Sequence, residues 1–255
     1  MPSKEQPREL IGTSPTGNVR IATYNVHKCR GMDRRVNMER VAQVMEALNA
    51  DIIAVQEILH GDGNNSQVRF LSERLRYQCS FGENRVHGGA PYGNAIFSRL
   101  PIVGEQNYDI TWKSRERRGC LRCDIRLPDR SVLHVFNVHL GTSYFERPHQ
   151  ARLLLTDALA RNKSIPGPRV VVGDFNEWTS GMASSLMKER FASVDAKLRK
   201  KTFPGVLPLF ELDHFYFDWH LKLENFSIVR TPLAKLASDH LPLVADFRFA
   251  SRKVA

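Results

Sequence analysis

The sequence predicts an α/β fold, a mixed α/β sandwich formed by one domain of the 255-residue chain. Short runs rich in β-branched and apolar residues recur along the whole length, bounded by Gly, Pro, Asp or Asn as strands are. Segments of helical periodicity separate some early runs, whereas the late runs follow one another as hairpins do. Neither a repeat nor a linker divides the chain into two composition regimes. These three observations favour a single layered domain.

The strands are the elements that the sequence predicts most clearly, because their apolar runs are its strongest signal. In chain order they are expected over residues 19–26, 51–58, 92–98, 120–127, 131–140, 169–176, 209–217, 224–230 and 240–249.

Helices are expected between some of these strands. In NMERVAQVMEAL the residues Met38, Val41, Met45 and Leu48 recur at helical spacing, and Asn37 is suited to the N-cap. Further helices are expected over 147–161 and 180–191, and polar loops over 60–66, 85–91 and 141–149.

Composition narrows the class of protein. Lys and Arg total 37 against 27 Asp and Glu, which gives a net charge of +10 and favours either an anionic partner or simple solubility. An apolar fraction of 42% excludes a disordered chain. Residues 1–18 are polar and predict a disordered tail ahead of a folded domain at 19–250. We expect no transmembrane segment or signal peptide, hence a cytoplasmic protein.

The four cysteines are expected to be free thiols. Cys120 and Cys123 form a CxxC, but on a strand two residues three apart point to opposite faces. This argues against a zinc or redox site.

Polar side chains directly follow several apolar runs, where burial of a carboxylate is costly unless it is compensated. Converging strand ends could share a divalent cation. The hard oxygen donors at these ends favour Mg²⁺, Mn²⁺ or Ca²⁺ over zinc, and they are Asn25, Glu57, Asp174, Asn176 and Asp239. Taken singly, each has an ordinary interpretation as a turn former or surface residue.

Several motifs together resemble the endonuclease/exonuclease/phosphatase superfamily, the fold of DNase I-like enzymes. They are YNVH, AVQE, YGNAIFSRLPI, ERRGCL, FNVHL, VVVGDFN, the strand ending in Asp213, and SDHLPLVADF. GDFN and SDHLP are the most specific, and the resemblance spans residues 19–249. It implies a four-layer α/β sandwich with two central mixed sheets flanked by helices, and a site where the strand ends meet.

The resemblance also implies roles for individual residues. Glu57 would hold Mg²⁺, for which Mn²⁺ would substitute, with Asn25 beside it and Asp239 contributing directly or through water. His240 would be the general base or would hold the scissile phosphate, and Asp213 would orient it.

Further residues complete the implied active site. Asp174 would position or activate the water, and Asn176 would donate to a phosphate oxygen. His139 would stabilise the transition state or assist the leaving group, and Asn137, on the same face of its strand, would bind substrate. Arg118, next to Arg117, is expected to contact phosphate, the alternative being a solvated basic loop.

The expected function is Mg²⁺-dependent hydrolysis of a phosphodiester, in nucleic acid first (as an endonuclease or exonuclease). A phospholipid headgroup or a small-molecule diester is the alternative substrate. Within the superfamily, the sequence most resembles a bacterial group of uncharacterised phosphodiesterases. Tyr144 and Phe145, beside Arg147 and His149, would stack on bases, lie at a lipid interface or pack on the rim. A non-catalytic basic binding module is disfavoured because Glu57, Asp174, Asp213 and His240 are all present. We expect a monomer.

Overall fold

Two six-stranded mixed sheets form the centre of the computed structural model, which describes residues 17–63, 66–156, 165–178, 181–194 and 201–249. The first sheet has the strand order β11 (Leu221–Ile228), β12 (Leu243–Phe249), β1 (Asn18–Asn25), β2 (Ile52–Leu59), β4 (Ala90–Ser98) and β3 (Gln78–His87). The second has the order β5 (Ile102–Asp109), β6 (Gly119–Arg126), β7 (Val132–His139), β8 (Arg169–Asp174), β10 (Asp213–Phe217) and β9 (Ala192–Ser193).

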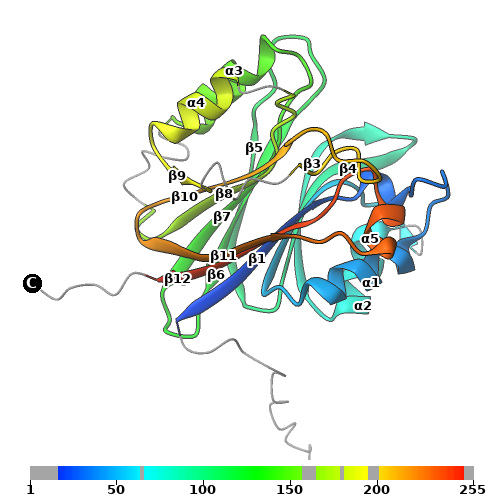
Figure 1. Ribbon diagram of the computed structural model, residues 1–255, viewed down its shortest axis with the longest axis horizontal. Coiled ribbons are helices and arrows are strands. Elements are labelled where there is room, and N and C mark those ends of the chain that lie inside the picture. Colours follow the sequence, from blue (N-terminus) through cyan, green and yellow to red (C-terminus); the bar gives the residue numbers. More distant parts are fainter. Residues whose placement is uncertain (1–16, 64–65, 157–164, 179–180, 195–200, 250–255) are drawn as a thin grey trace, which may run out of the picture.

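Helices cover the outer face of each sheet (Figure 1). The first sheet carries α1 (Met38–Leu48), α2 (Gln67–Leu75) and α5 (Pro232–Ala237), and the second carries α3 (Glu146–Leu154) and α4 (Met182–Lys188). A third apolar core lies between the sheets, where Ile21 and Ile52 meet Val135 and Val170. Four layers result, because each sheet buries both of its faces.

Most of the expected elements are confirmed. Eight of the nine expected strands overlap an observed strand in all but at most three of their residues, and Asn37 caps α1 by accepting a hydrogen bond from Arg40 N at 2.9 Å. The strand expected over 209–217 is shorter: Phe210 pairs with Phe203 instead, and β10 begins at Asp213, which was expected to end an apolar run. Cys120 packs under α3 and α4 whereas Cys123 lies between the sheets, so the CxxC does point to opposite faces, and all four cysteines are free.

Some expectations need correction. Residues 85–91 are not a loop: β3 continues to His87 and β4 starts at Ala90, leaving a tight turn at Gly88 and Gly89. Strands β3, β5 and β9 and helices α2 and α5 were not expected. The helix expected over 147–161 ends at Leu154, and its part from 157 on lies outside the described residues, as does the tail at 1–16. Within the described ranges no helix is long and apolar enough to span a bilayer.

Candidate active site

Strand pairing brings the polar strand ends to one edge of the sandwich. In the first sheet β1 and β2 run parallel, with Asn25 opposite Gln56. In the second sheet β7 and β8 run parallel with His139 opposite Asp174, and β10 places Asp213 on the other side of Asp174. Because β1 and β2 also contact β8 across the sandwich, the two rows of polar ends face each other.

A buried polar layer holds the two sheets together just below this edge. Asn137 donates both amide hydrogens to backbone carbonyls of the first sheet, Val55 O at 2.8 Å and Ala95 O at 2.9 Å. Its Oδ1 accepts from Gln56 Nε2 at 2.7 Å. The Asn137 side chain is therefore fully used between the sheets, and it lies beneath the site rather than in it.

Glu57 enters the site through a β-bulge. The pairing of β2 with β4 shifts register between Val55 and Ile58, and Glu57 there has a φ of 58°. An extra residue in a strand re-aims the side chain next to it, and positive φ in a non-glycine residue is uncommon. The bulge turns the Glu57 carboxylate towards Asn25, whose Nδ2 donates to Glu57 Oε1 at 3.1 Å.

A left-handed turn follows β1 and carries a lysine into the site. His27, Lys28 and Cys29 have φ values of 45°, 59° and 55°. Lys28 Nζ lies 2.9 Å from Glu57 Oε2, so the cation neutralises the carboxylate at that side. The turn is held by its buried Cys29 and by Gln67, which donates to the Lys28 carbonyl at 2.6 Å.

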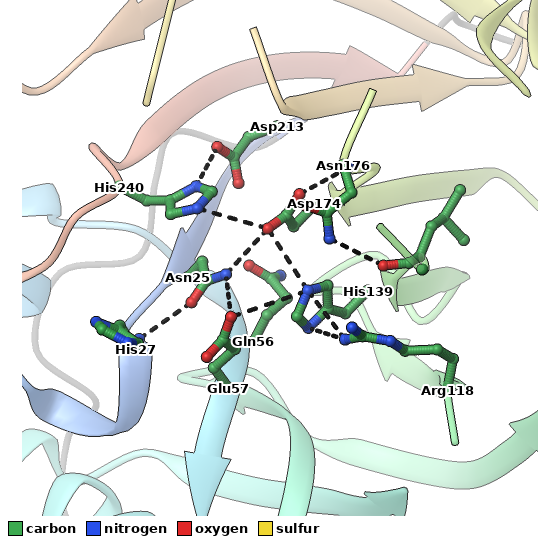
Figure 2. Close-up of polar contacts among 12 residues, drawn as sticks. Asn25, His27, Gln56, Glu57, Arg118, His139, Asp174, Asn176, Asp213 and His240 are labelled. Carbon is green, nitrogen blue, oxygen red and sulfur yellow. Dashed lines mark hydrogen bonds and ion pairs between the residues drawn. The ribbon is translucent and has the colours of Figure 1, made fainter. Parts of the chain in front are cut away.

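Asn25 is the central contact of the site (Figure 2). Its Nδ2 also donates to Asp174 Oδ2 at 3.0 Å, so one amide joins carboxylates from both sheets. Its Oδ1 accepts from His27 N at 3.0 Å, and its backbone carbonyl accepts from Ser238 Oγ at 2.7 Å. Asn25 thereby connects the turn after β1, the second sheet and the segment before β12.

His240, Asp213 and Asp174 form the second half of the site (Figure 2). His240 Nδ1 lies 2.9 Å from Asp213 Oδ2, and His240 Nε2 lies 3.6 Å from Asp174 Oδ2. Burial opposes charging of His240, but Asp213 and Asp174 outweigh it and raise its pKa to about 10. For Asp174, burial disfavours the charged carboxylate and raises the pKa of the carboxyl. The imidazole is thus positioned by one carboxylate and faces the other.

His139 has the opposite electrostatic environment. Arg118 Nη1 lies 3.0 Å from its Nδ1 and 3.1 Å from its Nε2, and both side chains are buried. Burial and the neighbouring guanidinium lower the pKa of His139 to about 4. His139 Nε2 lies 3.7 Å from Asp174 Oδ2 and 3.9 Å from Glu57 Oε1. A neutral histidine and a protonated one therefore flank the same carboxylate.

The remaining predicted residues lie around this centre. Asn176 Nδ2 donates to Leu140 O at 2.9 Å, and its backbone N–H donates to Asp174 Oδ1 at 2.8 Å. Asp239 lies at the open side, with Oδ1 3.6 Å from His27 Nδ1. Arg117 is exposed, whereas its neighbour Arg118 is buried in the site.

The donor set fits a hard divalent cation. Glu57, Asn25 and Asp239 offer carboxylate and amide oxygens, the ligands that Mg²⁺ and Mn²⁺ prefer. His139 and Lys28 outweigh the effect of burial and hold the pKa of Glu57 well below its usual range, so this carboxyl is ionised. Asp174, Asp213 and His240 offer a second group of ligand atoms, all within 4.8 Å of one another.

Lys28 and Gln56 were not expected from the sequence. Lys28 follows the end of β1 by three residues, and its left-handed conformation has no signature in the local residue types. Gln56 precedes Glu57 in the same AVQE run, and alternation along the strand could have placed it on the inner face.

Comparisons with known proteins agree with this geometry. The family profile described as "Endonuclease/Exonuclease/phosphatase family" matches residues 22–240. The chain is 29% identical to the uncharacterised protein YbhP of Escherichia coli over 89% of this chain and 95% of that protein. It superposes on an endonuclease/exonuclease/phosphatase structure from Beutenbergia cavernae with a TM-score of 0.75 and 22% identity, covering 94% of this chain and 73% of that one. A mannosyl-6-phosphatase of Bacteroides thetaiotaomicron gives a TM-score of 0.74 at 19% identity, covering 91% and 100%.

Proposed function

The chain belongs to the endonuclease/exonuclease/phosphatase family, and from that premise we propose that it is a Mg²⁺-dependent phosphodiesterase. One observation supports this most directly. Asn25 joins the carboxylates of Glu57 and Asp174, and His240 Nε2 lies 3.6 Å from Oδ2 of Asp174, the oxygen that also accepts from Asn25. An oxygen-rich cation site thus adjoins a carboxylate and a histidine, which are the groups that hydrolysis of an anionic ester requires.

The cation would be held by Glu57, Asn25 and Asp239, with Mn²⁺ as a substitute for Mg²⁺. When bound, the ion supplies Lewis-acid polarisation of a phosphoryl oxygen. Lys28 adds a fixed positive charge at the same side of Glu57, which favours binding of an anionic substrate.

Asp174 is the residue we assign to the water nucleophile. It is buried, and its Oδ2 lies between the two histidines. Accepting a proton from water is the role of such a carboxylate, and a positioned general base contributes about 10²–10⁴-fold. Asp213 fixes the orientation of His240, so that Nε2–H is directed into the site and holds a phosphate oxygen.

Arg118, His139 and Asn176 complete the phosphate-binding side. Arg118 holds His139 neutral, and together they present a guanidinium and an imidazole to the charge that develops on the phosphorus oxygens. Asn176 has a second amide hydrogen beyond the one given to Leu140 O, which leaves a donor for phosphate. Asn137 acts from below, by keeping the sheets in register.

Hydrolysis of bis-p-nitrophenyl phosphate in Mg²⁺ tests the proposal. We expect EDTA to abolish the activity and His240→Ala to lower kcat by about 10²–10⁴-fold, since the phosphate loses its positioned donor. His220→Ala is the matched control: His220 also lies beside an aspartate, Asp218 at 3.2 Å, but is exposed and beyond the opposite end of β10.

Two results would contradict the proposal. One is activity that survives both EDTA and His240→Ala. The other is a preference for the monoester p-nitrophenyl phosphate over the diester, as a sugar phosphatase would show.

A further inference from the structure

Apolar side chains project from two loops beside the candidate active site. Residues 203–210 form a hairpin in which Phe203 and Phe210 pair, with Phe210 N donating to Phe203 O at 2.8 Å. Val206, Leu207 and Leu209 at its end expose 56%, 67% and 51% of their surface. Three large aliphatic side chains exposed within four residues mark a contact surface more often than scattered single ones do.

The hairpin is fixed against the catalytic segment. Gly205 N donates to Asp239 O at 2.7 Å, and Leu241 N donates to the carbonyl of Thr202 at 3.0 Å. The Phe203 ring packs on His240, with ring centroids 5.0 Å apart. The exposed tip is therefore held rigidly next to the imidazole that we assign to the phosphate.

The second loop leaves the same edge of the sandwich. It begins directly after His139, at the end of β7, and carries Tyr144 and Phe145, which expose 57% and 69%. Their rings pack edge to face at 5.6 Å, so they present one apolar projection. Since His139, Asp174 and Asp213 are adjacent in register across β7, β8 and β10, the two projections flank the catalytic carboxylate.

Basic loops lie at this edge as well. The segment before β6 contains Lys113, Arg115 and Arg117, all exposed, and β6 starts at the edge where β7 ends. The loop after β1 adds exposed Arg34 and Arg35. The surface around the site thus combines rigid apolar tips with positive charge.

This combination fits one kind of partner. Apolar tips enter the headgroup boundary of a bilayer while Lys and Arg bind its anionic phosphates. A nucleic acid would use the aromatic rings and the basic loops, but the aliphatic side chains of the hairpin offer its bases no stacking surface. We propose that the hairpin 203–210 and the Tyr144–Phe145 pair dock this chain on an anionic lipid bilayer, so that the diester brought to Asp174 is that of a phospholipid headgroup. The substrate assignment rests on the proposed function; the docking does not.

Co-sedimentation with vesicles tests the docking. We expect binding to phosphatidylcholine–phosphatidylglycerol vesicles and little binding to phosphatidylcholine alone. Leu207→Ser with Leu209→Ser should lower the apparent affinity by about tenfold or more, because the lost apolar contacts are those that enter the bilayer. Arg115→Glu with Arg117→Glu should remove the preference for anionic vesicles.

Trp219→Ser provides the matched control. Trp219 exposes 77% of its surface but lies in the turn after β10, at the end of that strand far from Asp213. This variant should bind vesicles as the unmodified chain does. All of these variants should hydrolyse bis-p-nitrophenyl phosphate at the unmodified rate, since none of them alters a catalytic residue.

The outcomes separate the two proposals. Three results would overturn the docking even if the soluble diester is hydrolysed. The first is absence of vesicle binding, and the second is an equal loss of vesicle affinity in Trp219→Ser. The third is loss of DNA or RNA binding in the leucine variant. Conversion of a dimer to a monomer by the leucine substitutions would also overturn it, by assigning the surface to a second copy. Vesicle binding without any diester hydrolysis would support the docking and overturn the proposed function.

Discussion

Asn137 shows how a polar residue can serve the site from beneath it. Its amide hydrogens go to Val55 O and Ala95 O, and its Oδ1 accepts from Gln56. Every one of these bonds crosses from the second sheet to the first, just below the carboxylates. A buried hydrogen-bonding group in this position stabilises the folded protein mainly because its partners would otherwise be buried without a hydrogen bond, which is costly.

Replacing Asn137 with Ala should therefore cost stability. Two backbone carbonyls and the Gln56 amide would lose their donor or acceptor in a dry interior, and we expect the free energy of unfolding to fall by about 3 kcal/mol. Urea denaturation followed by circular dichroism measures the change.

Asn225→Ala is the control for this substitution. Asn225 also bonds to a neighbouring strand, through Asp246 at 3.3 Å, but it is exposed. We expect a change within about 0.5 kcal/mol there. Equal effects at both positions would contradict the structural role of Asn137, and an unchanged stability with a raised KM would return it to substrate binding.

The chemistry-bearing residues were accessible from the sequence, whereas their mutual arrangement was not. Asn25 and Asp174 each end an apolar run, and this pattern marks a strand end at which a buried acid needs a partner. Asp213 was predicted to end a strand but begins β10, which runs antiparallel to β8 and so starts at the same edge. Nothing in the residue types marks the bulge at Glu57 or the left-handed turn that brings Lys28 to it, because both depend on pairing between distant segments.

At the scale of elements, the turn from His27 to Cys29 is the most strained part of the site. Three successive non-glycine residues adopt positive φ, a conformation that costs roughly 1–2 kcal/mol per L-residue. The surrounding contacts that hold it include Val26 N bonded to Gln56 O at 3.1 Å. The strain persists because these contacts, the bond from Gln67 to the Lys28 carbonyl and the Lys28–Glu57 ion pair hold the turn in place.

Comparing His27→Gly with His27→Ala measures this strain. Both variants lose the imidazole and its contact with Asp239, so the difference between them reports the backbone alone. We expect the Gly variant to be more stable by about 1 kcal/mol, because Gly adopts positive φ without steric cost. Thermal and urea unfolding both give this difference.

Gln43 provides the opposite case. It is exposed within α1, where Gly is less favourable than Ala by about 1 kcal/mol. Gln43→Gly should therefore be less stable than Gln43→Ala. A His27 pair with the same sign as the Gln43 pair would rule out left-handed strain in the turn.

The elements missed from the sequence share a physical cause. β5 is an edge strand in which most side chains are exposed, and β3 at the edge of the other sheet alternates only weakly, so neither has a continuous apolar run. α5 has six residues and starts with Pro232, too short for a periodic signal. The central strands, buried on both faces by sheet and helices, were the ones that the sequence predicted best.

At the scale of the molecule, the two sheets meet in a cluster of acids within a chain of net charge +10. Glu57 comes from the first sheet and Asp174 from the second. The amide of Asn25 joins the two carboxylates, and Lys28 beside Glu57 and the protonated His240 beside Asp174 supply positive charge. Lys28 neutralises Glu57 within the first sheet, whereas His240, which precedes β12 of that sheet, neutralises Asp174 and Asp213 of the second. Binding of a divalent cation at this edge should therefore raise the melting temperature of the whole domain.

Mn²⁺ and Mg²⁺ should raise the melting temperature of the unmodified chain. A ligand that binds only the folded state at 100 times its Kd adds about 2.7 kcal/mol, or about 5 °C for a domain of this size. Glu57→Gln should lose this increase, because an amide is a weaker ligand than a carboxylate, whereas Glu105→Gln on the exposed edge of β5 should retain it. Differential scanning fluorimetry across a Mn²⁺ titration distinguishes the two variants without any substrate. An equal increase in both would place the cation away from Glu57, and the three-residue group at Asp174 would then be the site to substitute next.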